Sequence, residues 1–401
     1  MRLFILLFTL ISQPGWALEP IRVGILHSLT GTMAQSETPL KNVALMTIDQ
    51  INAQGGVLGR PLEGVVVDPG SDWDRYTELA DELLSKEGID VLFGCWTSVS
   101  RKATIPALER NGGLLFYPVQ YEGEERHPQI FYMGAAPNQQ AIPAAEYLLR
   151  PSGGSFTQFA LLGTDYIYPR TSNTILRNFL LSRGIHPDDI IEIYTPFGHA
   201  DFSAELSQIR DFAGQNPHVA IISTVNGDAN NALYSSFQNA VMSAENFPII
   251  AFSVGETELQ SVEPQAAAGH LASWNYFMAL KSKSNIAFID QYRSWLSSNM
   301  PHIDAKTAVV NDPMEATYIG IHLWRQAVEL AGTTDPLSVK ERMGNLRFHA
   351  PSGYEIRVDP KNHHLYKPVF LGRANTSGQF DIIWRSPSPL KASAFSSYMR
   401  P

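Results

Sequence analysis

Short apolar runs of strand length alternate with helical patterns along the N-terminal part of the chain. Four such runs are IRVGIL (21–26), EGVVVD (63–68), DVLFGC (90–95) and GLLFYP (113–118). Between them lie NVALMTIDQINAQGG and TELADELLSKEG, in which apolar residues recur at helical spacing and glycine follows. Strands that are apolar on both sides and alternate with helices predict a parallel sheet covered on both faces.

The same pattern begins again at residue 130. Strand-like runs are IFYMGAA, FALLGTD, IIEIYTP, VAIISTV and PIIAFSV, with helical segments between most of them. Two strand-and-helix series of similar length predict an α/β protein of two doubly wound parallel-sheet lobes. After about residue 269 the chain is more helical, and residues 354–384 alternate like antiparallel strands around a turn at 375–378.

The first 17 residues have the pattern of a secretory signal peptide. Arg2 precedes the apolar run LFILLFTLI, and small residues stand at Gly15 and Ala17, so cleavage is expected between Ala17 and Leu18. This nine-residue run is too short for a membrane anchor, which needs ~20 residues. The mature protein is therefore expected to be exported, and its single cysteine cannot form an internal disulfide.

Composition bounds the size of the core and the class of partner. With 401 residues, of which 44% are hydrophobic, the chain can bury a large core and should form two domains or one large one. The formal net charge is -9 and the chain has no run of Lys and Arg. A nucleic acid is therefore not expected as a partner.

The motifs that would indicate an enzyme are missing from the sequence. Cys95 ends an apolar strand, and the sequence places no histidine beside it, so it is interpreted as a small buried hydrophobe. His363 and His364 would point to opposite faces of a strand, and no Cys or third His stands at ligand spacing. There is no G-x-S-x-G, H-E-x-x-H or Walker loop. We expect no catalytic residues, no metal and no cofactor.

Polar and aromatic side chains gather where the predicted strands end. Ligands of doubly wound sheets bind at these carboxyl ends, beside helix N-termini. The segments are SLTGTMAQSE (28–37), CWTSVS (95–100), YPVQYEG (117–123), TDYIYPR (164–170), VNGDANN (225–231) and SVGETE (253–258). Each alone is compatible with ordinary capping, for example by Thr97 or Ser98. Six such ends, from both halves of the chain, favour a ligand cleft between two lobes.

Several of these segments carry a resemblance to a known family. IRVGILHSLTGTMAQSE, LFGCWTSVSRKA, LLFYPVQYEGEE, GTDYIYPRTSN, AGHLASWNYF and DPKNHHLYKPVFLG resemble the urea-binding component of bacterial urea ABC transporters. They are also similar to short-chain amide-binding transport proteins and to the amide-sensing regulator of amidase operons. The resemblance runs in order from about Glu19 to Arg385.

The resemblance implies a type I periplasmic-binding-protein fold, whose two lobes are joined by a three-strand hinge. It implies a periplasmic protein that captures urea or a short-chain aliphatic amide and delivers it to the permease subunits of an ABC transporter. The expected division is a signal peptide at 1–17, lobe 1 at 18–136 and 266–343, lobe 2 at 137–265 and 344–386, and a C-terminal tail at 387–401.

The resemblance also implies a set of ligand-binding residues. They are Trp96, Thr97, Ser98, Tyr117, Val119, Gln120, Tyr166, Tyr168, Asn226, Asp228, Ser36 and Glu37. The amide sensor has YPTPY where this chain has YPVQY (117–121), which follows the urea-transport pattern, whereas the tail IIWRSPSPL is closer to the amide sensor.

The chemistry of urea fits such a set of residues. Urea is neutral and offers one carbonyl acceptor and four N–H donors, so its pocket needs one or two donors and several acceptors. Helix N-terminal N–H groups or hydroxyls would bind the carbonyl oxygen, and Glu37, Asp228 and Gln120 would accept N–H groups. Two other functions remain open: a periplasmic sensory module acting on a membrane receptor or kinase, and, least favoured, an amide-hydrolysing enzyme.

Overall fold

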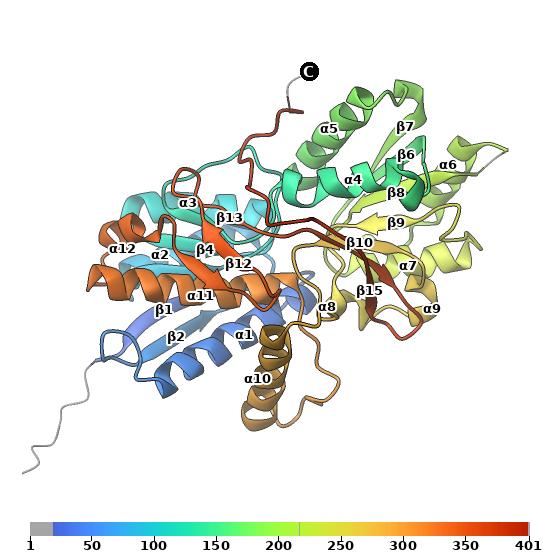
Figure 1. Ribbon diagram of the computed structural model, residues 1–401. Coiled ribbons are helices and arrows are strands. Elements are labelled where there is room, and N and C mark those ends of the chain that lie inside the picture. The colour runs from blue at the N-terminus through green and yellow to red at the C-terminus, as the bar shows by residue number, and fades with distance from the viewer. Residues whose placement is uncertain (1–18, 216, 400–401) are drawn as a thin grey trace, which may run out of the picture.

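The computed structural model describes residues 19–215 and 217–399. The expected signal peptide lies outside these residues. Two lobes lie side by side, each built on a twisted sheet with helices on both faces (Figure 1). The predicted pair of doubly wound α/β lobes is therefore confirmed.

Lobe 1 contains a five-stranded parallel sheet in the order β2-β1-β3-β4-β5. Its strands are β1 (Ile21–Leu26), β2 (Leu62–Val67), β3 (Val91–Gly94), β4 (Leu114–Tyr117) and β5 (Ile130–Tyr132). Its helices are α1 (Ala34–Ala53), α2 (Trp73–Ser85), α3 (Ser98–Asn111), α10 (Lys283–Asn299), α11 (Asp312–Ala331) and α12 (Pro336–Met343). The apolar runs predicted from the sequence form the first four strands to within one residue at each end.

Lobe 2 contains a seven-stranded sheet in the order β15-β14-β10-β9-β8-β6-β7. Its strands are β6 (Gln158–Thr164), β7 (Ile190–Thr195), β8 (Val219–Thr224), β9 (Ile249–Ala251), β10 (Leu271–Trp274), β14 (Phe370–Ala374) and β15 (Phe380–Arg385). Its helices are α4 (Ala141–Leu149), α5 (Ile167–Ser182), α6 (Ser203–Ala213), α7 (Ala229–Asn239), α8 (Glu256–Leu259) and α9 (Pro264–Ala267). Strands β14 and β15 are antiparallel and form the hairpin predicted around 375–378.

The chain crosses between the lobes at 133–140, 275–282 and 367–369, and the last two crossings lie later than expected. Residues 271–274 were assigned to lobe 1, but β10 pairs with β9 and β14 in the sheet of lobe 2. Residues 347–366 were assigned to lobe 2, but their strands β11 (Arg347–His349), β12 (Glu355–Val358) and β13 (Leu365–Tyr366) pack on lobe 1. Buried Ile356, Val358 and Leu365 join the core of lobe 1, which is the physical reason for that boundary.

The C-terminal tail runs over both lobes instead of hanging free (Figure 1). Ser393 N–H donates to Asn138 Oδ1 and Ser396 N–H donates to Glu124 Oε1 beside the first crossing. Farther along, the Tyr398 carbonyl accepts from Asn178 on α5, and its ring meets Phe179 edge to face. The tail therefore straps the loop after β4 to lobe 2.

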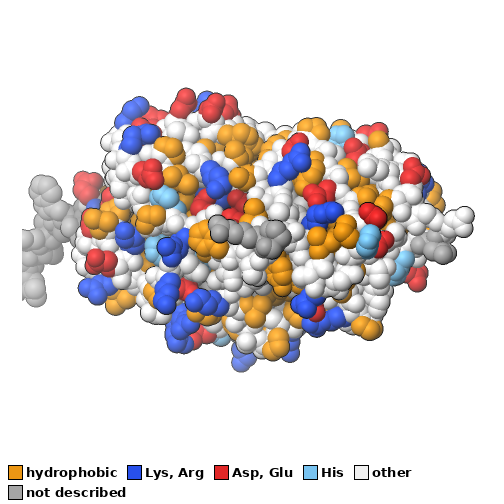
Figure 2. Space-filling view, turned by 90° about the horizontal axis from the view of Figure 1, so that it is seen from above, with side chains coloured by type: hydrophobic (Ala, Val, Ile, Leu, Met, Phe, Trp, Pro, Cys, Tyr) orange, Lys and Arg blue, Asp and Glu red, His pale blue; other side chains and the backbone are white. Residues whose placement is uncertain are grey.

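The surface carries both signs of charge. On the face shown in Figure 2, Lys and Arg side chains are interspersed with Asp and Glu. Within residues 19–215 and 217–399, no helix is long and apolar enough to cross a membrane.

Candidate functional site

The segment between β3 and α3 forms one wall of the candidate site. Cys95 adopts a left-handed backbone conformation, with φ of 67°, which turns the chain sharply at the end of the strand. Thr97 then caps α3, because its hydroxyl accepts the Ser100 N–H at 3.1 Å. Trp96 stands between these two residues in the chain and is 2% exposed, and its carbonyl accepts the Tyr117 hydroxyl at 2.6 Å.

Side chains of the two lobes meet directly across the cleft. Trp96 Nε1 donates to Asn226 Oδ1 at 3.3 Å, and Asn226 Nδ2 in turn donates to the Tyr166 hydroxyl at 2.9 Å. Nearby, Gln120 Nε2 donates to Ser253 Oγ at 3.0 Å. The lobes are thus closed on each other, and these five residues come from the ends of five different strands, β3, β4, β6, β8 and β9.

Tyr168 lies beside the Gln120 and Ser253 pair. Burial raises the pKa of its phenol, while hydrogen bonds with Gln120 and Ser253 act in the opposite direction. Tyr166 is partly exposed at the same edge, and its pKa is also raised, by burial and then by the neighbouring Tyr168, Tyr117 and Glu122. Both phenols are therefore neutral across the physiological pH range.

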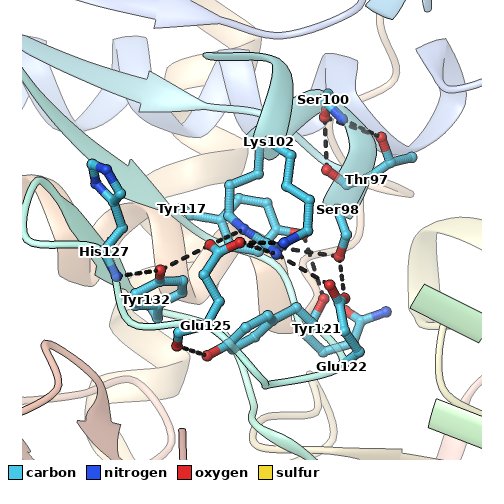
Figure 3. A network of polar contacts seen from close by, with 12 residues as sticks. Thr97, Ser98, Ser100, Lys102, Tyr117, Tyr121, Glu122, Glu125, His127 and Tyr132 are labelled. Carbon is cyan, nitrogen blue, oxygen red and sulfur yellow. Dashed lines mark hydrogen bonds and ion pairs between the residues drawn. The ribbon is translucent and has the colours of Figure 1, made fainter. Parts of the chain in front are cut away.

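A buried charge network supports the lobe 1 wall (Figure 3). Glu122 accepts the Ser98 hydroxyl, and Arg101 donates to Ser98 Oγ at 3.1 Å and to Glu122 Oε1 at 3.3 Å. Arg101 also pairs with Glu125 at 2.8 Å, and Lys102 reaches Glu125 at 2.5 Å. The network holds two carboxylates and two cations, so its formal charge is balanced.

Aromatic rings enclose the centre of this network. The Arg101 guanidinium is fully buried and lies 4.8 Å from the ring centre of Tyr117 and 4.6 Å from that of Tyr121. Burial alone would raise the pKa of Glu125, but the attraction and hydrogen bonds of Arg101 and Lys102 lower it to about 2. Glu125 is therefore ionised throughout the physiological range.

Two of the predicted site residues, Glu37 and Ser36, have other partners, and a third, Asp228, is exposed. Glu37 lies inside lobe 1, where it accepts from the Ser28 N–H and the Tyr76 hydroxyl and bonds to His27 Nδ1. The Ser36 hydroxyl forms a hydrogen bond across the lobes, donating to Glu258 Oε1 at 2.7 Å. Asp228 is exposed before the first turn of α7 and has no side-chain cap bond. The expectation that Glu37 accepts ligand N–H groups is therefore wrong, because its carboxylate is buried and bonded inside lobe 1, whereas the same role for Asp228 stays a prediction.

Two others stand behind the site. Val119 packs in the apolar core of lobe 1 with Tyr117. The Tyr117 hydroxyl is already engaged by the Trp96 carbonyl, so both residues shape the wall without offering a free polar group. His363 and His364, which were weighed as metal ligands, stack on Phe131 and Tyr132 respectively.

Comparison with known proteins identifies the family. A family model described as a periplasmic binding protein domain matches residues 21–401. The chain belongs to the periplasmic binding protein family. Members of this family are solute-binding proteins of ABC transporters and not enzymes, as expected from the sequence.

Relatives of this periplasmic binding protein differ in the ligands named for them. It is 23% identical over 365 residues to the leucine-, isoleucine-, valine-, threonine- and alanine-binding protein of Pseudomonas aeruginosa, covering 86% of this chain and 88% of that one. It is 33% identical over 126 residues to limonene hydroxylase of Geobacillus stearothermophilus, but that match covers only 31% of this chain and 21% of the relative.

The fold is shared with solved structures of the family. One is a solute-binding protein of an ABC transporter from Rhodopseudomonas palustris in complex with 3,4-dihydroxybenzoic acid, with 18% identity and a TM-score of 0.79. The match covers 93% of this chain and 98% of that one. The type I periplasmic-binding-protein fold expected from the resemblance is therefore confirmed.

The expected set of site residues lacks Ser253, although its segment was named. It also lacks Glu122 and Arg101. A signal for them was present: the acidic run EGEE follows the fourth strand, and Arg101 stands one helical turn after Ser98. Their significance emerges only when the loop after β4 folds against the first turn of α3.

Proposed function

We propose that this periplasmic binding protein captures urea or a short-chain aliphatic amide in the inter-lobe cleft, for delivery to the permease of an ABC transporter. The observation that carries the proposal is the electrical neutrality of the residues that meet there. Trp96, Gln120, Tyr166, Asn226 and Ser253 are uncharged, and the adjoining Glu122 is already paired with Arg101.

A charged ligand would fit this arrangement poorly. An amino acid brings a carboxylate and an ammonium group, and an aromatic acid brings a carboxylate, each of which needs a partner when it leaves water. Glu122, Arg101, Glu125 and Lys102 lie on the lobe 1 wall and pair with one another, while Glu258 accepts the Ser36 hydroxyl across the lobes. A neutral polar ligand would not disturb that pairing.

The hydrogen-bonding groups favour a ligand that carries N–H donors. Gln120 is 3% exposed, and its Oε1 is buried without a hydrogen-bond partner within the described part of the chain. A buried acceptor of this kind costs free energy until a donor reaches it. Urea has four N–H groups and acetamide two, so either can supply that donor.

The expected affinity follows from the size of the ligand. Four heavy atoms at a ceiling of roughly 1.5 kcal/mol each give about 6 kcal/mol, or a Kd of tens of micromolar. Tighter binding of urea would mean that closure of the lobes pairs every polar group of the ligand.

A thermal-denaturation panel tests the proposal. Urea, at low millimolar concentration to avoid denaturation, is compared with formamide, acetamide, leucine and 3,4-dihydroxybenzoate. A ligand at 100 times its Kd should raise the free energy of unfolding by about 2.7 kcal/mol. We expect stabilisation by urea or the small amides, whereas stabilisation by leucine or the aromatic acid alone would refute the proposal.

A further inference from the structure

The hydrogen bonds around Ser98 fix the direction of its hydroxyl. A serine hydroxyl has one O–H to donate and two lone pairs to accept with. The Ser98 hydroxyl bonds to Glu122 Oε2, while Arg101 Nη1 donates to the same Ser98 oxygen at 3.1 Å. Arg101 has no acceptor, so it takes one lone pair of Ser98.

Glu122 forms an ion pair with Arg101, which leaves Ser98 as the donor in the bond between Ser98 and Glu122. The guanidinium of arginine stays protonated in proteins. Arg101 is fully buried, and its Nη2 lies 3.3 Å from Glu122 Oε1. An ionised carboxylate accepts only, so the single hydroxyl hydrogen of Ser98 is committed to it. What remains on Ser98 is one lone pair.

Glu122 contacts Ser98 and also lies within electrostatic reach of lobe 2. It is 2% exposed, and it contributes to the electrostatic environment of Tyr166 and Tyr168 on the opposite lobe. The unpartnered Gln120 Oε1 belongs to the same loop after β4, two residues before Glu122. Two acceptors, one on Ser98 and one on Gln120, are therefore available on this wall.

We infer that Glu122 is a positioning residue that turns Ser98 into an acceptor and so makes the site select ligands by their N–H groups. This inference rests on the proposed function and makes it more specific. It removes the Ser98 hydroxyl from the groups expected to bind the carbonyl oxygen and leaves helix N-terminal N–H groups and other hydroxyls for that role. The ligand's carbonyl oxygen would then bind to a group other than the Ser98 hydroxyl. If Ser98 were released from Glu122, the site would lose its preference for ligands with N–H groups.

Three planar ligands of four heavy atoms isolate this property. Urea carries four N–H groups, acetamide two and acetone none, while all three share a carbonyl. Sites built to hydrogen-bond a ligand N–H reject an analogue that lacks it, because their own buried groups are left unpaired. We expect affinity in the order urea, acetamide, acetone, with acetone at least about 100-fold weaker than urea.

The test combines Glu122→Gln with Ser98→Ala in a double-mutant cycle, measured by calorimetry and by competition against urea. A glutamine can donate to Ser98 Oγ and release the hydroxyl hydrogen. We expect E122Q to reduce the ratio of urea to acetone affinity by about tenfold, and to have little further effect once Ser98 is alanine. Glu124→Gln is the matched control, because Glu124 lies in the same loop but contacts Ser396 of the tail.

The single variant S98A gives a second test that does not depend on the folding of E122Q. Loss of the acceptor should weaken urea and acetamide binding while acetone binding stays within about twofold of the wild type. Equal weakening of all three ligands, or an E122Q effect that persists undiminished in the S98A background, would overturn the inference. A wild-type protein that binds none of the three would instead overturn the proposed function on which it rests.

Discussion

Cys95 shows how one backbone conformation sets the start of the binding wall. Its φ of 67° places Trp96 in the cleft and Thr97 at the cap of α3. The thiol itself is fully buried, and burial followed by the nearby charge of Glu37 raises its pKa. Because the thiolate is the reactive form, the folded protein keeps this cysteine inert.

We therefore predict that Cys95 resists alkylation by iodoacetamide at pH 8 in the native protein and reacts once the chain is unfolded. Replacement Cys95→Ala should lower the free energy of unfolding by about 1 kcal/mol through lost packing and leave ligand affinity unchanged. Mass spectrometry and denaturant titration measure the two effects. Rapid alkylation of the native protein would contradict the assignment of Cys95 as a structural residue.

Whether a site residue could be predicted from the sequence depends on where its hydrogen-bond partners lie along the chain. The segments that hold Trp96, Gln120, Tyr166 and Asn226 could be predicted because strand ends of doubly wound lobes converge, and the family resemblance singled out these residues within them. Glu37 stands at such an end too. Its carboxylate, however, accepts the hydroxyl of Tyr76, which lies 39 positions away in the sequence and inside lobe 1. No local pattern distinguishes a carboxylate that faces a ligand from one that is satisfied by its own lobe.

At the scale of elements, Asn275 ties the three crossings together. It stands on the second crossing, and its side-chain amide donates to the Gln139 carbonyl on the first at 2.9 Å and to the Pro368 carbonyl on the third at 2.7 Å. Its own N–H donates to Asp312 Oδ2, which also pairs with buried Lys367. The hinge is thus held by side-chain bonds in addition to its backbone.

Replacement Asn275→Ala should lower the free energy of unfolding by about 2–4 kcal/mol, because two buried carbonyls each lose a donor. Asn275→Asp should be at least as harmful, since an ionised carboxylate cannot donate. Asn299→Ala, which removes a bond on an exposed stretch of α10, is the control and should change stability by under about 0.5 kcal/mol. Chemical denaturation of the three variants decides, and an N275A protein as stable as the control would contradict this role.

The elements themselves were largely predictable, and the errors lie in the short ones. Strands β1 and β2 have six residues each and are separated by the long helix α1, so both were found from the sequence. Strands β10 and β13 have only four and two residues. The lobe that each joins depends on its pairing partner in the sheet; for β10, Leu271 pairs with Ile250, more than 20 positions away. Periodicity finds that a short strand exists but does not say which sheet it joins.

At the scale of the whole molecule, buried ionisable groups shape the dependence of stability on pH. Burial raises the pKa of Glu256, beside the second crossing, to about 8 and that of Glu315 on α11 to about 7, from an ordinary value of 4.5. Between the ordinary pKa of 4.5 and these raised values, the two carboxyl groups are still protonated in the folded state but ionised in the unfolded state. The free energy of unfolding therefore falls as pH rises through this window.

The buried histidines act in the opposite direction at lower pH. Burial lowers the pKa of His270 to about 3 and those of His322 and His364 to about 4, so only the unfolded state is protonated at these rings between about pH 4 and 6.5. Above pH 6.5 the histidines are neutral in both states, so only Glu256 and Glu315 among these groups still change the free energy of unfolding. We predict a loss of stability from pH 6.5 to 8.5.

Glu256→Gln should reduce that loss, because its neutral amide does not titrate. Exposed Glu263→Gln is the control and should follow the wild type. Denaturant titrations at pH 6.5, 7.5 and 8.5 measure the slopes. A wild-type protein equally stable at all three values would show that Glu256 and Glu315 titrate near their ordinary pKa values when folded.

The closed arrangement of the two lobes leads to the central claim, that a neutral amide occupies the cleft between them. Isothermal titration calorimetry of the purified protein with urea, and in parallel with leucine, tests it most directly. The account predicts saturable binding of urea at one site per chain, with a Kd of tens of micromolar or tighter, and no binding of leucine. Saturable binding of leucine without binding of urea would contradict it.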